Sequence, residues 1–254
     1  MIELSPEHHP GLRPLFSDFG LRLHGLIEAV CSPDFGRAWV DDPVSPSVAV
    51  SQIDFWIVGG DPGAAAAAEA LRMAPTSGTI ITAGEAWDDL VRETLGAGVR
   101  ERTRTGFATP HPQAWDRARL REMAASLPEG FAIRRVTAES LGTFLDVAKD
   151  FTSNWRSPEA CLAHGVGFGV FEGDRCVAGC GSFTLAGKRL EVEIDTEPGY
   201  RRRGLARAVA AALILHCLEA GIEPCWDAHN PESAALALQL GFVEPCPYTV
   251  FVVG

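Results

Sequence analysis

The chain has 254 residues, 46% of them hydrophobic, and a formal net charge of −11, a composition typical of a folded globular protein rather than a disordered one. Its length allows one large domain or two smaller ones. With 33 acidic residues against 22 basic ones, its field repels nucleic acid and anionic membranes, so neither is expected as a partner. The same field attracts cationic small molecules.

The cysteines and the first residues predict a cytoplasmic protein. The seven cysteines form no CxxC pair, and several lie in apolar runs, as expected for buried, reduced thiols. The segment from Met1 to Pro10 lacks the basic and apolar parts of a signal peptide. His8-His9, His111 and His164 have no cysteine or carboxylate partners at the spacing of a metal site, so no metal is expected.

The first half of the chain is predicted to mix helices and strands. A β-rich segment over 47–58 ends at Gly59-Gly60-Asp61-Pro62-Gly63, after which an alanine-rich helix is expected, with Asp61 as its N-cap. Strands are predicted over 79–82 and 103–108, and helices over 86–95 and 115–125.

The turn signal at 127–130 predicts a domain boundary. It divides the chain into an N-terminal α/β domain, residues 1–127, and a C-terminal domain, residues 128–254. In the second domain, strands are predicted over 131–136, 166–171, 176–184, 190–196, 222–226 and 248–253, and helices over 139–148, 204–220 and 231–240. The fold class is therefore α/β (α+β).

A strand, a basic turn and a helix follow one another between Leu190 and Ala206. The first turn of a helix presents unpaired N–H groups and a partial positive charge, and Gly204 lets the backbone approach a phosphate. The three preceding arginines add charge-assisted donors. The alternative is an ordinary connection with solvated arginines. Further along, Asn230 and Pro231 predict a helix start.

These residues resemble two motifs of the GNAT superfamily of N-acetyltransferases. Arg201-Arg202-Arg203-Gly204-Leu205-Ala206 matches the R/Q-x-x-G-x-G/A signature, and Asn230, Ser233, Leu236, Gly241 and Phe242 match N-x-x-S/A-x-x-L-x-x-x-x-G-F. The resemblance covers roughly residues 131–253. It implies a central mixed, mostly antiparallel sheet flanked by helices.

A closer resemblance is to the GNAT subfamily of the zwittermicin A resistance acetyltransferases, which carries an additional N-terminal domain. Three segments carry it: Asn154-Trp155-Arg156-Ser157-Pro158-Glu159, Glu193-Ile194-Asp195-Thr196 and Cys225-Trp226-Asp227-Ala228-His229-Asn230.

The resemblance implies acetyl-coenzyme A as the acyl donor and assigns the residues that hold it. Backbone groups of Ile194, Asp195 and Thr196 would pair with the pantetheine arm, which Asn230 would also contact. The N–H groups of one continuous segment would hold the pyrophosphate: Arg201, Arg202, Arg203, Gly204, Leu205 and Ala206.

Several residues are candidates for the proton transfers of amine acetylation. Strand alternation places Glu191, Glu193 and Asp195 on one face of the strand. Glu193 or Glu191 would act as the base. The alternative is that all three carboxylates lie on a solvated face. His229 is a further candidate base, with a structural role as the alternative.

The tyrosine that protonates the leaving thiolate in many GNAT enzymes is replaced here by Ala237. Tyr248 is the candidate substitute, with an anchoring role as the alternative, and solvent could also supply the proton.

Four residues are predicted to border the acceptor pocket: Trp155, Arg156, Ser157 and Asp227. For the aromatic segment that contains the first three, the alternative is a role as a structural anchor. The expected function is direct transfer of an acetyl group to an amine of a small molecule, for example an antibiotic or a polyamine-like compound. The alternatives are a non-catalytic coenzyme A-binding or sensor protein and a transferase of a longer acyl group. The sequence leaves the oligomeric state open, with a homodimer as one arrangement.

Overall fold

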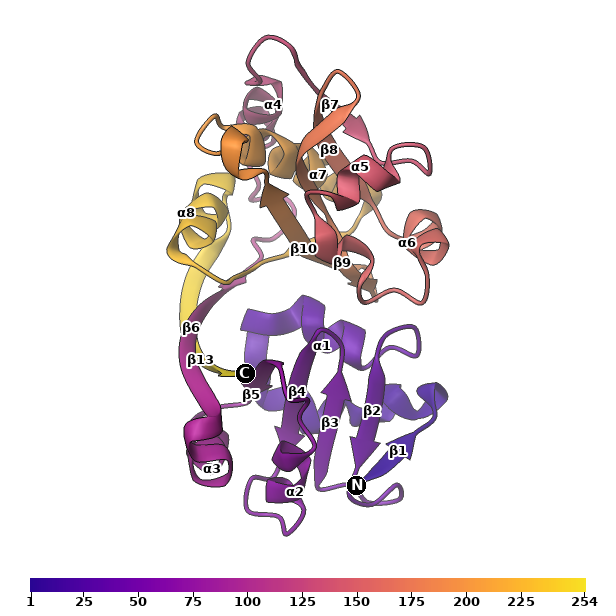
Figure 1. Ribbon diagram of the computed structural model, residues 1–254, viewed down its shortest axis with the longest axis vertical. Helices are drawn as coiled ribbons and strands as arrows, with labels where there is room; N and C mark the ends of the chain where they lie inside the picture. The colour runs from indigo at the N-terminus through magenta and orange to yellow at the C-terminus, as the bar shows by residue number, and fades with distance from the viewer.

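Two sheets form the framework of the computed structural model, which describes residues 1–254 apart from the side chains of Leu21 and Arg22. In spatial order, the eight-stranded sheet consists of β1 (Ile2–Leu4), β2 (Arg37–Val40), β3 (Val48–Gln52), β4 (Phe55–Gly60), β5 (Gly78–Thr82), β13 (Val243–Val253), β6 (Val99–Ala108) and β12 (Asp227–Ala228). The five-stranded sheet consists of β11 (Glu223–Cys225), β10 (Arg189–Thr196), β9 (Arg175–Ala186), β8 (Gly167–Glu172) and β7 (Phe131–Arg135). Figure 1 shows the second sheet above the first, with β6 and β13 running along one side.

Helices cover both sheets. They are α1 (His24–Val30), α2 (Ala67–Arg72), α3 (Glu85–Leu95), α4 (Arg117–Ala125), α5 (Leu141–Leu145), α6 (Pro158–His164), α7 (Leu205–Ala220) and α8 (Pro231–Leu240). Four 3-10 segments accompany them: η1 (Pro6–Leu23), η2 (Gly96–Gly98), η3 (Lys149–Thr152) and η4 (Pro198–Tyr200). No helix among the described residues has the length and apolar character needed to cross a membrane.

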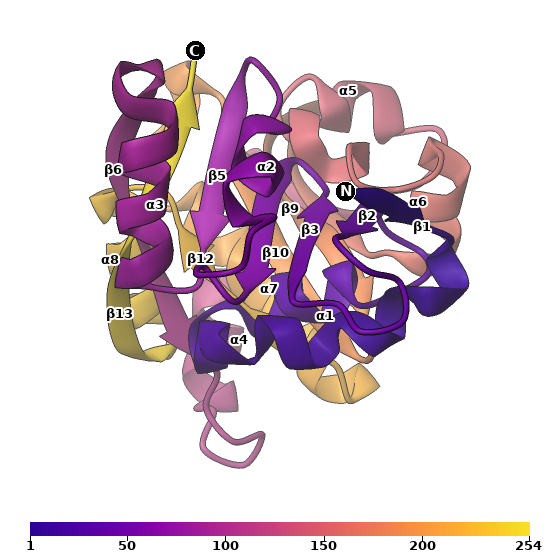
Figure 2. The same ribbon diagram turned by 90° about the horizontal axis from the view of Figure 1, so that it is seen from below.

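The eight-stranded sheet buries side chains on both faces. Trp56 and Val58 of β4 pack with α2 and α3, which Figure 2 shows on the outer face, whereas Ile57 between them packs with η1 and α1. Burial on both faces explains why this strand is a continuous apolar run.

The five-stranded sheet lies between α7 and the segment of α5 and η3. Cys180 of β9 belongs to the core formed with α7, while Gly179 and Gly181 face Phe144 and Phe151 on the other side. A Cβ atom at Gly181 would stand 2.5 Å from the ring of Phe151, so the ring fills the space of the missing side chain.

The last strands return to the first sheet. β13 pairs with β5 and β6, and β12 pairs with β6, so the chain rejoins the eight-stranded sheet after completing the five-stranded one. The mixed α/β class is confirmed. The domain boundary at residue 127 stays a prediction. The two sheets do not divide at this boundary, because β12 and β13 lie after it and belong to the same sheet as the strands before it.

The β-rich segment predicted over 47–58 is confirmed as a hairpin of β3 and β4, whose turn is held by the Asp54 N–H donating to Asn154 Oδ1 at 2.9 Å. Two details of the predicted helices are corrected. Asp61 does not cap a helix, since its Oδ1 accepts from the Gly63 N–H at 2.8 Å and α2 begins later, at Ala67. The helix predicted over 139–148 is shortened to α5.

Candidate active site

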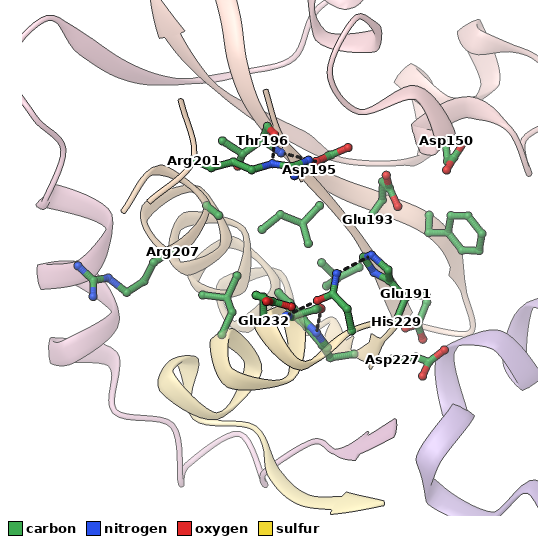
Figure 3. A pocket seen from close by; sticks show the side chains of 18 of the residues that line it. Asp150, Glu191, Glu193, Asp195, Thr196, Arg201, Arg207, Asp227, His229 and Glu232 are labelled. Atoms are coloured by element: carbon green, nitrogen blue, oxygen red, sulfur yellow. Dashed lines mark hydrogen bonds and ion pairs between the residues drawn. The ribbon is translucent and has the colours of Figure 1, made fainter. Parts of the chain in front are cut away.

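A cavity of about 1210 Å³ is lined by both halves of the chain. Its walls are β10, the turn before α7 with the first turn of that helix, α8, and residues of the N-terminal half that include Leu26, Phe55 and Arg104. Figure 3 shows four carboxylates at one end, with His229, and Arg207 at the other; the four belong to Asp150, Glu191, Glu193 and Asp227. The two ends therefore differ in charge.

The cavity exists because two parallel strands part. β10 pairs with β11 from Arg189 to Glu191, and the pairing ends where the chain crosses at Trp226 to form β12 in the other sheet. Beyond Glu191, β10 keeps β9 on one side and has no partner on the other among the described residues. Such an edge can dock an extended, amide-bearing arm as an added strand. Ile194, Asp195 and Thr196, predicted to pair with pantetheine, lie on it.

The turn before α7 lines the cavity with most of the residues predicted to hold the pyrophosphate. These are Arg201, Arg202, Gly204, Leu205 and Ala206. No side chain caps α7, and its N-cap, Gly204, has a φ of 81°, which favours glycine. The uncapped N–H groups of this first turn suit an anion.

Arg203 is the exception. It is not one of the described residues that line the cavity, and its guanidinium stacks over the Tyr200 ring at 5.0 Å. The contact predicted for Arg203 is made by its main-chain N–H group, so it stays a prediction whatever the position of the side chain.

Asn230 begins α8 as predicted. Its Oδ1 accepts from the Ser233 N–H at 2.8 Å, while Nδ2 lies 2.8 Å from Nε2 of His229. Both Asn230 and His229 line the cavity. Partial burial and the positive charge of Arg104 lower the pKa of His229.

Glu193 is partly buried and points into the cavity opposite Asp150 (Figure 3). Burial raises its pKa to about 7, and the negative charges of Asp150, Asp195 and Asp54 add to the effect. A carboxyl group with this pKa is suited to exchange protons near neutral pH.

Glu191 lies deeper and is 4% exposed. Burial raises its pKa to about 8, with a further contribution from the charge of Asp227, whose backbone N–H donates to it. The solvated-face alternative is wrong for Glu191, because α1 covers this part of β10: the carboxyl lies against Gly25.

Asp227 and Tyr248 form an anchored network at the same end. Asp227 Oδ2 accepts from Arg104 Nε at 2.7 Å and from the Tyr248 hydroxyl at 2.9 Å. Burial raises the pKa of Tyr248 well above its ordinary value, and this tyrosine is not one of the described cavity-lining residues. The geometry agrees with the anchoring role of Tyr248. Asp227 does line the cavity.

Trp155, Arg156 and Ser157 lie outside the described lining of the cavity. Trp155 donates from Nε1 to the Ser182 carbonyl at 3.2 Å, and Arg156 donates to the Pro33 carbonyl at 2.8 Å. Ser157 caps α6. These contacts are those of the structural-anchor alternative, and the cavity offers no support for substrate binding by the three residues.

The family model of the GNAT acetyltransferases matches residues 14–251. The chain belongs to the GNAT acetyltransferase family. The resemblance seen in the two motifs is thereby confirmed, and it extends into the N-terminal half.

Relatives of known sequence or structure agree with this family. An uncharacterised N-acetyltransferase, YdfB of Bacillus subtilis strain 168, is 31% identical over 180 residues, which are 69% of this chain and 66% of that protein. The match thus spans slightly less than two thirds of that relative. A GCN5-related N-acetyltransferase-like protein from Streptococcus suis 89/1591 has a TM-score of 0.81 at 28% identity, covering 99% of this chain and 100% of the other.

A third comparison concerns the fold alone. A GCN5-related N-acetyltransferase from Kribbella flavida has a TM-score of 0.61 at 16% identity, covering 94% of this chain and 95% of the other. Together the comparisons confirm the mixed GNAT sheet flanked by helices and support an acyltransferase.

Within this GNAT site, sequence reasoning missed Asp54, Phe55, Arg104, Asp150 and Arg207, all of which line the cavity. Four of them come from segments without a motif, and only folding brings them to β10. Arg207 had a signal, since it follows the basic turn on the first turn of α7. Among the described residues, no group of three or more histidine, cysteine or acidic side chains is arranged to hold a metal ion.

Proposed function

We propose that the protein is an acetyl-coenzyme A-dependent N-acetyltransferase that acts by direct transfer on an amine of a cationic small molecule, such as a polyamine-like compound or an aminated antibiotic. The observation that carries the proposal is the free edge of β10 beyond Glu191, with Glu193 projecting beside it into the cavity. The zwittermicin A resistance-like subfamily is part of this proposal.

The residues present fit coenzyme A in two ways. The free edge of β10 offers backbone groups to the amides of a pantetheine arm, and Asn230 faces the same space. At the turn, a Cβ atom on Gly204 would meet nothing closer than Arg207 Nη2 at 3.6 Å, so the backbone is open to an anion.

Glu193 is the proposed base. With a pKa of about 7, a large fraction of its carboxyl is ionised at neutral pH and can take a proton from the acceptor ammonium. In the transfer, a C–N bond would form at the carbonyl carbon of the acetyl thioester as the C–S bond breaks, with the electron pair going to sulfur. The nitrogen would then release its second proton to solvent to give the neutral amide. Ala237 is buried where many relatives carry the acid, so water is the proposed proton source for the thiolate.

Carboxylates favour a cationic acceptor. Asp54 of the β3–β4 turn and Asp150 of η3 line the cavity with Glu193, and both add negative charge to its surroundings. A substrate with a second ammonium group would gain from this charge, in keeping with the net charge of the chain.

The test is release of thiol from acetyl-coenzyme A with a panel of diamines, polyamines and amino sugars. We expect turnover with at least one cationic amine and a rise in melting temperature with coenzyme A, since a ligand at 100 times its Kd contributes about 2.7 kcal/mol. Stabilisation without any turnover would favour the coenzyme A sensor, which Ala237 also fits. Faster turnover with a longer acyl donor would favour the third alternative, and absence of both binding and turnover would contradict the proposal.

A further inference from the structure

Glu191 is a buried carboxyl group at the reactive end of the cavity to which the proposed mechanism assigns no role. It is 4% exposed and lines the cavity, where Figure 3 shows it in the group of Glu193, Asp227 and His229. The main-chain N–H of Asp227 donates to it, and no side chain of the described residues forms a hydrogen bond or an ion pair with it. Because a buried carboxyl without such a partner costs free energy, a ligand group that supplies one is stabilised there.

The groups that face Glu191 give it no cation of its own. Among the described residues, Arg104 of β6 is the positive side chain that acts on it, and Arg104 is ion-paired to Asp227, from Nε to Oδ2 at 2.7 Å. From α1 the carboxyl meets Gly25, and from β11 it faces the Cys225 thiol, neither of which is positively charged. Burial and the charge of Asp227 therefore raise the pKa of Glu191 to about 8, so the carboxyl is mostly protonated at pH 7.

The spacing of Glu191 and Glu193 suits a short diamine. The two residues lie two positions apart on β10 and both line the cavity, so their carboxyl groups are separated by about 6.6 Å along the strand. The nitrogens of an extended diamine with about three or four methylene groups span a similar distance. The N-terminal half lines the same cavity with Leu26 and Phe55, which offer apolar surface to a methylene chain.

We propose that Glu191 binds a second ammonium group of the acceptor, and that the acceptor is a short aliphatic diamine whose reacting nitrogen lies at Glu193. The inference rests on the proposed function for the reaction and adds the place and the spacing of the second charge. On binding, the Glu191 carboxylic acid releases its proton to solvent, and the carboxylate accepts hydrogen bonds from the ammonium group. A charge-assisted pair of this kind is stronger than a hydrogen bond between neutral groups.

The first experiment compares kcat/KM for acetylation of diamines from ethane- to hexane-diamine with that for alkylamines of the same length. We expect a maximum at propane- or butane-diamine, about ten- to hundredfold above the matching alkylamine. Glu191→Gln keeps the size and the neutral state of the protonated carboxyl, and in this variant the ratio of diamine to alkylamine should fall to about one. Glu122→Gln, at an exposed position on α4, is the control and should keep the wild-type ratio.

The second experiment measures the protons released when the amine binds to the protein saturated with coenzyme A, which allows binding without transfer. Isothermal titration at pH 7 in buffers of different ionisation enthalpy gives this number. For the wild-type protein, butane-diamine should release about one proton more than butylamine, because Glu191 ionises only for the diamine. Glu191→Gln should abolish the difference, whereas Glu122→Gln should retain it.

Three outcomes would overturn the inference while leaving the proposed function intact. One is equal kcat/KM of the wild-type protein for diamines and alkylamines, a comparison that needs no variant. Another is binding of the diamine without the additional proton, which would mean that Glu191 stays protonated. The third is an equal loss for both amines in a folded Glu191→Gln protein, which would assign Glu191 to proton transfer instead. If the wild-type protein acetylates neither kind of amine, the proposed function fails together with the inference.

Discussion

The Oε2 atom of Glu191 lies 2.4 Å from the point that a Cβ atom would occupy on Gly25. The absence of a side chain at residue 25 therefore lets α1, from the N-terminal half, pack directly on β10 of the five-stranded sheet. This close approach buries the Glu191 carboxyl and brings the N-terminal half to the reactive end of the cavity. The N-terminal half is thus part of the site rather than an appendage.

Gly25→Ala should destabilise the protein and lower its activity. The new methyl group would overlap the Glu191 carboxyl and stand 3.0 Å from Cβ of Cys225, so either this buried carboxyl or α1 must shift. Overpacking of this kind costs about 1–3 kcal/mol, measurable as a lower urea midpoint. Gly11→Ala is the control, because nothing lies within 4 Å of the Cβ position there. Equal midpoints for the two variants would show that the contact is not tight.

The pH dependence of catalysis should follow Glu193. Because its raised pKa is about 7, the basic form increases as the pH rises through 7, so kcat/KM should increase about tenfold per unit below this value and level off above it. Glu193→Gln should lower kcat/KM by about 10²- to 10⁴-fold and remove the inflection. Initial rates between pH 5 and 9 check this, with Glu139→Gln at an exposed position as the control.

The pH profile also tests His229 as the alternative base. Its pKa is lowered from the ordinary value of 6.5, so a profile controlled by His229 would have its inflection below 6.5. A wild-type inflection in that range which His229→Asn abolishes would assign the base to His229 instead. Retention of the inflection near pH 7 in His229→Asn would support Glu193.

The basic turn and the N-cap of α8 were predictable from sequence because each is a local feature. Gly204 joins a run of three arginines to an apolar helix, and Asn230-Pro231 is a helix-start pair, so both positions follow from neighbouring residues alone. The alternation of β10 likewise predicted the shared face of Glu191 and Glu193.

The acceptor end was not predictable because it is made by contacts between distant segments. Asp54 lies in a turn without glycine or proline, and that turn is held by Asn154, 100 residues away. The return of β13 to the first sheet depends on its pairing with β5 and β6, which its own alternation does not specify. Trp155 was predicted to border the acceptor pocket or to act as a structural anchor, and its indole N–H donates to the Ser182 carbonyl.

Glu191 should make the stability of the protein fall as the pH rises. Its pKa is about 8 when folded and near 4.5 when unfolded, so between these values the folded chain holds a proton that the unfolded chain has released. The free energy of unfolding should therefore decrease through this group by roughly 1.4 kcal/mol per pH unit in that window. Glu191→Gln removes the contribution, and its advantage over the wild type in urea unfolding should grow from pH 5 to pH 8.

The control for this linkage is Glu122→Gln on α4, an exposed glutamate. Its stability difference from the wild type should not vary with pH. A constant difference between Glu191→Gln and the wild type across the window would mean that the Glu191 carboxyl is ionised in the folded protein.

Asp150→Asn should separate recognition of the acceptor from binding of the donor. Asp150 faces Glu193 and contributes negative charge to it, so its loss should raise KM for a diamine about two- to fivefold, the range of an exposed ion pair. The pKa of Glu193 should fall at the same time, which moves the inflection of kcat/KM to lower pH. Asp146→Asn, at an exposed position at the end of α5, is the matched control, and the Kd of coenzyme A should be the same in both variants. If Asp150 contacts the substrate, both the KM for the diamine and the pH of the inflection should change. An unchanged KM with a shifted inflection would mean that Asp150 raises the pKa of Glu193 without contacting the substrate.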